Sequence, residues 1–459
     1  MTGRRKVVPL ASDCIVVGAG ASGLAAARRL RAAGLSVMVL EARERVGGRL
    51  KRGTLAGQPV DLGGMWLGPS QKRLLALTEA YGLRTYETNL AGRNIVDFQG
   101  RAASGEGENV DAAFGLVAGL DYKATFGKLL ALARGLTLEE VQQGPALAWL
   151  DGWSVAAWVS RHARTRRARA TFAFLTRSML CAEPEDVSMR FFLFYMLAGD
   201  GAEVIFSAAP GGAQQFAYER GLVEVPERMA IELGDAVRLN TPVRTITQDA
   251  AGVRVEAAGA TFAAKRVIVA LPPTLAGQIA YDPLLPHQRD ALHQRMAMGS
   301  VIKVWIAYAR PFWREAGRNG FGLIADKPFS PWFDVSRPGR PEGLIVGFFD
   351  AAHARTWSPR GAEARRAETL RQLASAYGPE ALSPLDYVDH DWSEERWSRG
   401  CYGGFGGPGL LNACASALRT PCGRIHWAGT ETALEWCGYV EGALGAGERA
   451  ADEVIAATH

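Results

Sequence analysis

Hydrophobic positions along the chain change their spacing several times, and the changes predict its elements. A short apolar strand ends near Val17, a glycine turn follows, and an alanine-rich helix leads to a second strand that closes on Glu41. Between residues 111 and about 202, apolar residues recur at helical spacing. Beyond about residue 235 the pattern alternates again and predicts strands, among them 301–309 and 342–350. The opening strand–helix–strand order is typical of an α/β fold.

Three glycines and one acid in the first of these stretches predict a dinucleotide site. Gly18 permits a tight strand-to-helix turn, Gly20 lets backbone amides approach a pyrophosphate, and Gly23 lets the helix pack closely on its strand. Glu41 ends the second strand, where a carboxylate accepts hydrogen bonds from a ribose. NAD and FAD share this pattern, so the pattern alone does not choose between them.

The residues that follow favour FAD. Arg43, Gly48 and Arg49 add fixed positive charge and flexible backbone to the phosphate-binding surface. Gly63 and Gly64, in the segment DLGGMWLG, mark a second place where bare backbone can lie against a flat ring system.

The C-terminal segment predicts the other half of the same site. A strand over 425–428 leads into a Gly-Thr-Glu turn and a helix that begins near Tyr439. We expect this segment to hold the ribityl and pyrophosphate groups and to approach the flavin ring, through Gly429, Thr430, Glu431 and Gly438.

Together these segments resemble the flavin-containing monoamine oxidase family over nearly the whole chain. The resemblance and the changes of pattern imply an α/β fold with a discontinuous, Rossmann-like FAD-binding domain of the GR2 type. We expect this domain to comprise residues 1–90, 204–284 and 388–459. The α+β substrate-binding domain would be formed by the two insertions, 91–203 and 285–387.

The resemblance also implies the catalytic residues. It makes Lys303 the lysine that holds a water against flavin N5 and assists hydride transfer or the later reaction of reduced flavin with oxygen. An isolated lysine on such a strand would by default face solvent. It makes Tyr402 and Tyr439 the walls of an aromatic cage that receives an amine. Cys401 occupies the position of a thioether link to FAD in some members, and both covalent and non-covalent binding stay open.

Further site residues follow from the same resemblance or from aromatic clustering. Gln214 matches a residue that lines the substrate cavity, and Val243 matches one whose backbone pairs with adenine. Trp392 and Trp397 are expected to support the flavin ring. The residues expected to shape the cavity are Phe191, Phe192, Phe194, Tyr195 and Trp332.

The function implied is FAD-dependent oxidative deamination of a small primary or cyclic amine, with O2 reduced to H2O2. An L-amino acid oxidase is an alternative that needs an arginine for the substrate carboxylate, for which Arg190 or Arg220 would serve. A polyamine oxidase needs carboxylates along a tunnel, but Glu183 and Glu185 follow a surface pattern. A dehydrogenase that passes electrons to a protein acceptor is a further alternative.

Composition narrows the class of protein without naming a substrate. The 459 residues are 48% hydrophobic and 22% charged, as in an ordinary globular enzyme, and the net charge of +5 is scattered, which does not favour nucleic acid binding. No apolar run reaches a membrane span, so a cytoplasmic protein without membrane contact is expected. The six cysteines lack metal-ligand spacing, and no metal is expected. A homodimer stays open.

Overall fold

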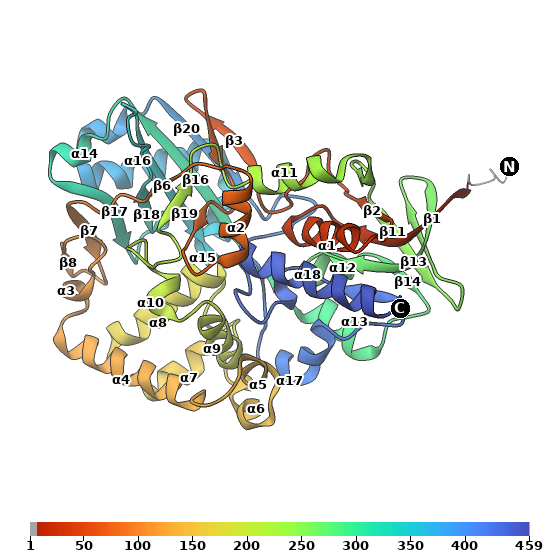
Figure 1. Ribbon diagram of the computed structural model, residues 1–459. Helices are drawn as coiled ribbons and strands as arrows, with labels where there is room; N and C mark the ends of the chain where they lie inside the picture. Colours follow the sequence, from red (N-terminus) through yellow and green to blue (C-terminus); the bar gives the residue numbers. More distant parts are fainter. Residues whose placement is uncertain (1–6, 459) are drawn as a thin grey trace.

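The computed structural model describes residues 7–458, which fold around two large β-sheets (Figure 1). The first sheet has the order β10–β2–β1–β13–β12–β11–β14, with β22 beside β13. Its strands are β1 (Val7–Val17), β2 (Val37–Leu40), β10 (Val237–Arg238), β11 (Val243–Gln248), β12 (Val253–Ala257), β13 (Ala260–Val269), β14 (Ala280–Asp282) and β22 (Ile425–Trp427). Because β1 pairs in parallel with β2 and β13, and β22 in parallel with β13, three distant stretches of chain form one sheet, as the spacing predicts.

Two long helices from opposite ends of the chain pack side by side on this sheet (Figure 1). They are α1 (Ala21–Ala32) and α18 (Val440–Ala456). Small residues allow the contact, since a Cβ on Gly447 of α18 would lie 2.1 Å from the Ser22 carbonyl oxygen of α1. The helix α11 (Glu224–Leu233) lies on the other side of α1.

The second sheet has the order β20–β16–β19–β18–β17–β7–β8. Its strands are β7 (Arg93–Asp97), β8 (Ala102–Ala103), β16 (Val301–Tyr308), β17 (Arg318–Ile324), β18 (Trp332–Asp334), β19 (Gly343–Asp350) and β20 (Asp386–Asp391). Along β16, Ile302 and Val304 face a core shared with the helices α14 (Phe312–Glu315), α15 (Ala351–Trp357) and α16 (Gly361–Tyr377). Val301 and Trp305 face the opposite core, and the pleat therefore turns Lys303 to that side as well.

The insertion after residue 110 is helical, as its apolar spacing predicts. It comprises α3 (Asp111–Phe114), α4 (Leu116–Leu132), α5 (Leu138–Gln143), α6 (Ala148–Asp151), α7 (Val155–His162), α8 (Arg166–Leu180), α9 (Met189–Ala198) and α10 (Ala202–Ile205). These helices form the lower left part of the molecule in Figure 1. The helix α9 is the most buried of them because aromatic and aliphatic residues surround it on all sides.

Short elements join the two sheets. The strand pair β3 (Arg52–Leu55) and β4 (Gln58–Asp61) is a hairpin, and the three-stranded sheet β5–β9–β6 consists of Trp66–Leu67, Phe216–Tyr218 and Thr85–Glu87. A further pair is β15 (Ala297–Met298) with β21 (Gly404–Phe405). The remaining α-helices are α2 (Lys72–Ala80), α12 (Pro273–Ala276), α13 (His287–Arg295) and α17 (Leu410–Cys414).

Two elements cross the expected domain boundaries. The boundary at residue 388 falls inside β20, which pairs with β16 of the second sheet. The helix α13 follows the boundary at 285 but packs on α12 and α17, on the side of the first sheet. Strand pairing therefore carries the part of the chain around the second sheet past residue 388. Helix packing carries the part around the first sheet past residue 285.

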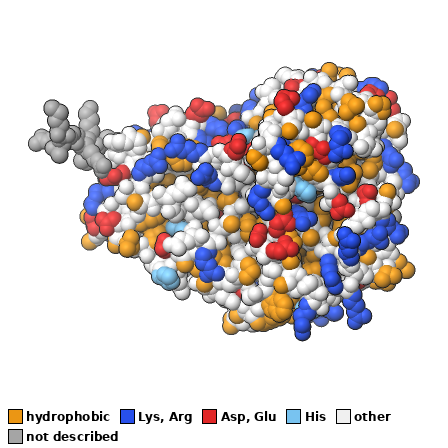
Figure 2. All heavy atoms as spheres, turned by 180° about the vertical axis from the view of Figure 1, so that it is seen from behind, with side chains coloured by type: hydrophobic (Ala, Val, Ile, Leu, Met, Phe, Trp, Pro, Cys, Tyr) orange, Lys and Arg blue, Asp and Glu red, His pale blue; other side chains and the backbone are white. Residues whose placement is uncertain are grey.

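The surface carries mixed charge. Figure 2 shows basic and acidic side chains interspersed, with hydrophobic ones between them, on the face that it presents. None of the helices within residues 7–458 has the length and apolar character of a membrane span.

Candidate functional site

One cavity of about 700 Å³ extends from the glycine turn of the first sheet to the helical insertion. At one end its walls are Gly18 and Gly20, and at the other they are Phe174 and Phe206. A cavity of this size and mixed lining is typical of a site that encloses a cofactor together with a small molecule. We call the first end the dinucleotide end and the other, which includes Tyr402 and Tyr439, the tyrosine end.

The glycine turn has the geometry that the sequence predicts. Gly18 has φ +101°, a conformation that favours glycine. A Cβ on Gly23 would lie 1.9 Å from the carbonyl oxygen of Gly18, so only glycine lets α1 pack against the turn. Gly18 and Gly20 line the cavity, whereas Gly23 lies outside the lining and acts through this packing.

Two helix N-termini open on the cavity without a side-chain cap. The N-cap of α1 is Gly20, which has no side chain, and the N-cap of α18 is Tyr439, whose side chain forms no capping hydrogen bond. Ala21, Ser22 and Val440 line the same cavity. Free N–H groups and helix dipoles favour anionic ligands, so the residues present fit the phosphates of FAD.

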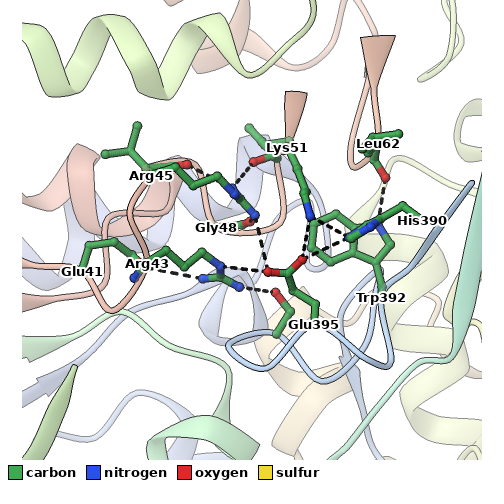
Figure 3. A network of polar contacts seen from close by, with 12 residues as sticks. Glu41, Arg43, Arg45, Gly48, Lys51, Leu62, His390, Trp392 and Glu395 are labelled. Atoms are coloured by element: carbon green, nitrogen blue, oxygen red, sulfur yellow. Dashed lines mark hydrogen bonds and ion pairs between the residues drawn. The ribbon is translucent and has the colours of Figure 1, made fainter. Parts of the chain in front are cut away.

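A network of polar contacts surrounds the dinucleotide end (Figure 3). Glu41 accepts hydrogen bonds from the backbone N–H of Ala19 at 2.8 Å and of Arg43 at 2.9 Å. The Arg43 guanidinium donates to Ser398 Oγ at 2.7 Å and lies 3.5 Å from Glu395. Glu41, Arg43 and Ser398 all line the cavity, so the network holds positive charge there.

Glu395 is the centre of this network, and the sequence offered no motif that marks it. Its carboxylate lies 3.1 Å from His390 Nε2 and accepts a hydrogen bond from Lys51 Nζ at 3.1 Å (Figure 3). The hydrogen bonds with His390 and Lys51 hold the pKa of Glu395 well below its usual range. Glu395 thereby joins the segment after Glu41 to the loop that follows β20.

Glu431 holds Arg49 on the cavity wall. Its carboxylate accepts hydrogen bonds from Arg49 Nη1 at 2.6 Å, from Arg49 Nη2 at 3.1 Å and from Gly404 N at 3.0 Å. Glu431 is buried and does not line the cavity, whereas Arg49 does. The oxygens of Glu431 hold Arg49 and Gly404 N, and a contact between Glu431 and the cofactor stays a prediction.

The other expected cofactor residues divide into two groups. Those that line the cavity are Gly18, Gly20, Glu41, Arg43, Gly48, Arg49, Gly63, Gly64, Trp397, Cys401, Gly429, Thr430, Gly438 and Tyr439. Val243 and Trp392 lie outside the lining. Val243 begins β11, close to Thr241, whose N–H donates to the Glu41 carbonyl at 2.7 Å. Trp392 donates to Leu62 O at 2.8 Å and lies behind Gly63.

Lys303 is buried on the cavity wall. It is 3% exposed, and its Nζ donates to the Gly63 carbonyl at 2.7 Å. The rings of Trp66 and Trp305 lie 5.7 and 5.4 Å from this nitrogen. Burial lowers the pKa of Lys303 to about 7, although the charge of Asp61 acts to raise it.

Tyr402 and Tyr439 both line the tyrosine end. The Tyr402 ring meets Phe348 edge-on at 6.0 Å, and the Tyr439 ring meets Trp436 edge-on at 5.0 Å. Burial raises the pKa of both phenols well above the ordinary value, so both rings present neutral aromatic surface. The cysteine before Tyr402, Cys401, also lines the cavity, and burial raises the pKa of its thiol to about 12.

Two of the expected substrate-pocket residues belong to the core instead. Phe192 on α9 is fully buried and contacts Phe172. Trp332 stacks on Phe329 at 5.8 Å and donates to the Tyr377 hydroxyl at 2.9 Å. Neither lines the cavity, whereas Gln214 does.

Aromatic residues close in sequence to Phe192 and Trp332 line the cavity instead. On α9 Tyr195 lines the cavity, and Phe191 and Phe194 do not. On β18 the lining residue is Phe333, one position after Trp332, because successive strand residues face opposite sides. Lining hydrophobic residues that the sequence pattern did not single out include Phe114, Phe174, Leu175, Met179, Phe206, Phe321, Leu323 and Phe348.

Charged residues at the tyrosine end also differ from those considered. Arg190 is buried away from the cavity and donates to the carbonyls of Val141 and Gly144, and Arg220 is exposed. Glu183 pairs with Arg177. The carboxylates that line the cavity there are Glu108 and Glu203.

Comparison with known proteins identifies the family. Residues 21–455 match the family described as flavin containing amine oxidoreductase. The chain is 36% identical to human amine oxidase [flavin-containing] B over 454 residues, which cover 96% of this chain and 86% of that protein. It is 36% identical to an L-amino acid dehydrogenase of Synechocystis over 96% of this chain and 94% of that protein.

The solved structures agree with this assignment and with the predicted fold class. Cyclohexylamine oxidase from Brevibacterium oxydans superposes with a TM-score of 0.92 at 29% identity, over 98% of this chain and 100% of that chain. The α/β fold with a discontinuous Rossmann-like FAD domain and a second domain for the substrate is thus confirmed. The chain belongs to the flavin-containing amine oxidoreductases and is an FAD-dependent amine oxidase.

Proposed function

We propose that the enzyme oxidises a small primary or cyclic monoamine to the imine while O2 is reduced to H2O2. The imine then hydrolyses in water to an aldehyde or ketone and ammonia. FAD, held by the glycine turn, Arg43 and the start of α18, would supply the two-electron acceptor for the amine and the reductant for O2. The residues of this chain bind and orient the amine, exclude water and hold the cofactor.

The observation that carries this proposal is the neutral, aromatic wall of the tyrosine end. Tyr402 and Tyr439 both line it, and their phenols stay protonated because burial raises both pKa values. The faces of such rings attract an amine nitrogen and its neighbouring carbon atoms. Lys303, anchored on the Gly63 carbonyl, supplies a further polar group on the same cavity.

The arginines argue against an α-amino acid as substrate. Within residues 7–458, Arg43 and Arg49 are the arginines that line the cavity. Arg49 is committed to Glu431 and to the carbonyl of Tyr402, and Arg43 contacts Glu395 and Ser398. A substrate carboxylate at the tyrosine end would thus be buried without a free guanidinium partner, at a cost of several kcal/mol.

Anaerobic bleaching of the flavin tests this choice. Each amine is paired with the α-amino acid that carries the same side chain, and the rate of loss of flavin absorbance is measured. We expect the amine to bleach the flavin about 100-fold faster or more than its amino acid. Equal or faster bleaching by the amino acid would overturn the proposal.

The reacting amine must be unprotonated, because a protonated nitrogen has no lone pair to assist hydride loss. The rate of bleaching should therefore rise with pH through the ionisation of the substrate. A flat profile between about pH 6 and pH 10 would contradict this requirement.

A diamine is a second candidate, favoured by Glu108 and Glu203 on the lining. Glu108 accepts hydrogen bonds from Ser207 Oγ and from Ala208 N at 2.8 Å, which fixes its carboxylate. Comparing a diamine with the monoamine of equal length tests this candidate. If it is right, Glu203→Gln should weaken the diamine about ten-fold and leave the monoamine unchanged.

Two finer points rest on simple measurements. Acid precipitation shows whether Cys401 forms a thioether, since the yellow colour then stays in the pellet, and Cys401→Ala is the matched control.

Stopped-flow mixing of the reduced enzyme with air shows whether O2 is the acceptor. Slow reaction with O2 and fast reaction with a redox protein would favour a dehydrogenase instead. A cytoplasmic location and a homodimer stay predictions.

A further inference from the structure

Asp61 is a buried carboxylate to which the proposed reaction gives no role. It ends β4, is 4% exposed and lies outside the cavity lining. Its Oδ2 accepts a hydrogen bond from the Leu222 N–H at 2.8 Å. Its Oδ1 is buried and has no hydrogen-bond partner within 3.5 Å among the described residues, although the Val223 backbone N–H also acts on the carboxylate. Because such an oxygen is costly to bury, its retention calls for a compensating interaction.

Two side chains of β16 hold the backbone beside this carboxylate. Trp305 Nε1 donates to the main-chain oxygen of Asp61 at 2.8 Å, and Lys303 Nζ donates to that of Gly63 at 2.7 Å. Trp305 and Lys303 are two positions apart and therefore lie on the same face of the strand. The lysine nitrogen is thus fixed on the segment that Asp61 begins.

The other groups near Asp61 leave Lys303 as its main electrostatic partner. Arg52 on β3 acts on Asp61 more weakly and pairs with Glu227 at 2.6 Å. From β6 and β9, Tyr86 and Tyr218 face Asp61, and burial keeps both phenols neutral by raising their pKa values.

The electrostatics are reciprocal. Burial raises the pKa of Asp61 to about 6, and the charge of Lys303 opposes this rise more than any other group does. Burial lowers the pKa of Lys303 to about 7, and the charge of Asp61 opposes this fall more than any other group does. The Cys401 thiol contributes less to the pKa of Lys303. Each residue thus keeps the other charged in a site where burial favours neutral forms.

We propose that Asp61 is the counter-ion of Lys303 and acts as a positioning residue that sets the pH range over which Lys303 presents an ammonium to the cavity. This inference rests on the proposed function, in which Lys303 adjoins the reacting atoms. It adds a residue that touches neither cofactor nor substrate and acts through Lys303.

The test compares the holoenzyme with Asp61→Asn, which keeps the shape and an acceptor for the Leu222 N–H. The rates of flavin reduction by an amine and of reoxidation by air are measured from about pH 5 to about pH 9. In the wild type we expect a step in the reoxidation rate centred near the Lys303 pKa of about 7. Lys303→Met should lack this step, and Asp61→Asn should move it down by about one pH unit or more.

Asp391→Asn is the matched control. Asp391 is also a buried aspartate with one oxygen that lacks a partner among the described residues, and it lies on β20 beside β16. Its substitution should leave the midpoint unchanged. An unshifted midpoint in Asp61→Asn, or a step that persists in Lys303→Met, would overturn the inference.

Urea denaturation gives a readout that does not depend on catalysis or on every variant holding FAD. Lys303→Met leaves the Asp61 carboxylate without its counter-ion, so the double variant Asp61→Asn/Lys303→Met should unfold at higher urea concentration than Lys303→Met. Additive losses would overturn the inference. If no amine reduces the wild-type flavin, the proposed function fails, and the denaturation cycle still decides whether the two charges stabilise each other.

Discussion

Glu395, beside the dinucleotide end of the cavity, meets several cations, whereas Asp350, near the tyrosine end, meets few. Glu395 lies within 3.5 Å of Arg43, Lys51 and His390, and its pKa falls well below the usual range. Asp350 ends β19, close to Tyr402, and burial raises its pKa to about 7 although Arg177 opposes the rise. At Glu395, hydrogen bonds outweigh desolvation and lower the pKa of the carboxyl. At Asp350, desolvation outweighs the nearby positive charge and raises the pKa.

The difference suits what each end has to bind. A pyrophosphate is anionic whatever the pH, so the dinucleotide end needs fixed positive charge held in place by carboxylates. A neutral amine needs a dry aromatic wall, and Asp350, close to Tyr402, is a buried carboxylate whose pKa is raised to about 7. Substitutions near either end of the cavity test this difference between the two regions.

Gly23→Ala should have the largest effect, because it removes the dinucleotide end. The new Cβ would lie 1.9 Å from the Gly18 carbonyl oxygen, and neither backbone can yield without displacing α1. We expect protein that lacks flavin absorbance or does not fold. The control is Gly127→Ala on α4, where a Cβ meets nothing within 4 Å and stability should rise by up to about 1 kcal/mol. Normal FAD content in Gly23→Ala would contradict the close packing.

Glu431→Gln should have the next largest effect. It leaves the Arg49 guanidinium beside an amide in place of a carboxylate that accepts two of its hydrogen bonds. Breaking such a buried pair should cost about 3 kcal/mol, measured by urea denaturation. The matched substitution Glu227→Gln, in the more exposed pair with Arg52, should cost less than about 1 kcal/mol. Similar losses would mean that burial does not set the strength of these pairs.

Asp350→Asn should stabilise the protein, in contrast to the substitutions above. The folded pKa of about 7 lies above the ordinary value of 3.8, so the folded state loses stability as pH rises between these values. Asparagine removes that loss, and the gain should reach about 2 kcal/mol at pH 8 and vanish near pH 4. Urea denaturation at the two pH values measures it. A loss of stability at pH 8 would show that hydrogen bonding outweighs desolvation at Asp350.

Glu395→Gln should have the smallest effect and the opposite sign. The folded pKa lies below the ordinary 4.5, so the carboxylate contributes stability above that value and loses it as pH falls through the folded pKa. Because the network is partly exposed, we expect a loss of about 1 kcal/mol near pH 7 that narrows below about pH 4. FAD should also dissociate more readily from this variant. If Glu395→Gln and Asp350→Asn changed stability in the same direction, the comparison would be wrong.

The sequence anticipated the features that depend on contiguous residues. Gly18 and Gly23 need only their own turn and helix, and α18 begins beside Tyr439 where the pattern changes. On β16, Lys303 faces the side opposite Ile302, as the alternation of side chains along any strand requires. These features follow from backbone sterics and periodicity, which act over a few residues.

Other site residues could not be identified in this way, because their partners are distant in the chain. Phe192 and Trp332 are aromatic like the true lining residues, and only packing separates them from Tyr195 and Phe333. Glu395 has no motif of its own, because its partners come from other segments.

By itself, the sequence determined the family, the cofactor and the strand–turn–helix that receives it, since each depends on local conformation. Only the tertiary structure decided which charges are buried together. Asp61 and Lys303 are 242 positions apart, and their pKa values depend on how far folding removes water from both. Desolvation is a property of the whole packed fold, and no short stretch of residues encodes it.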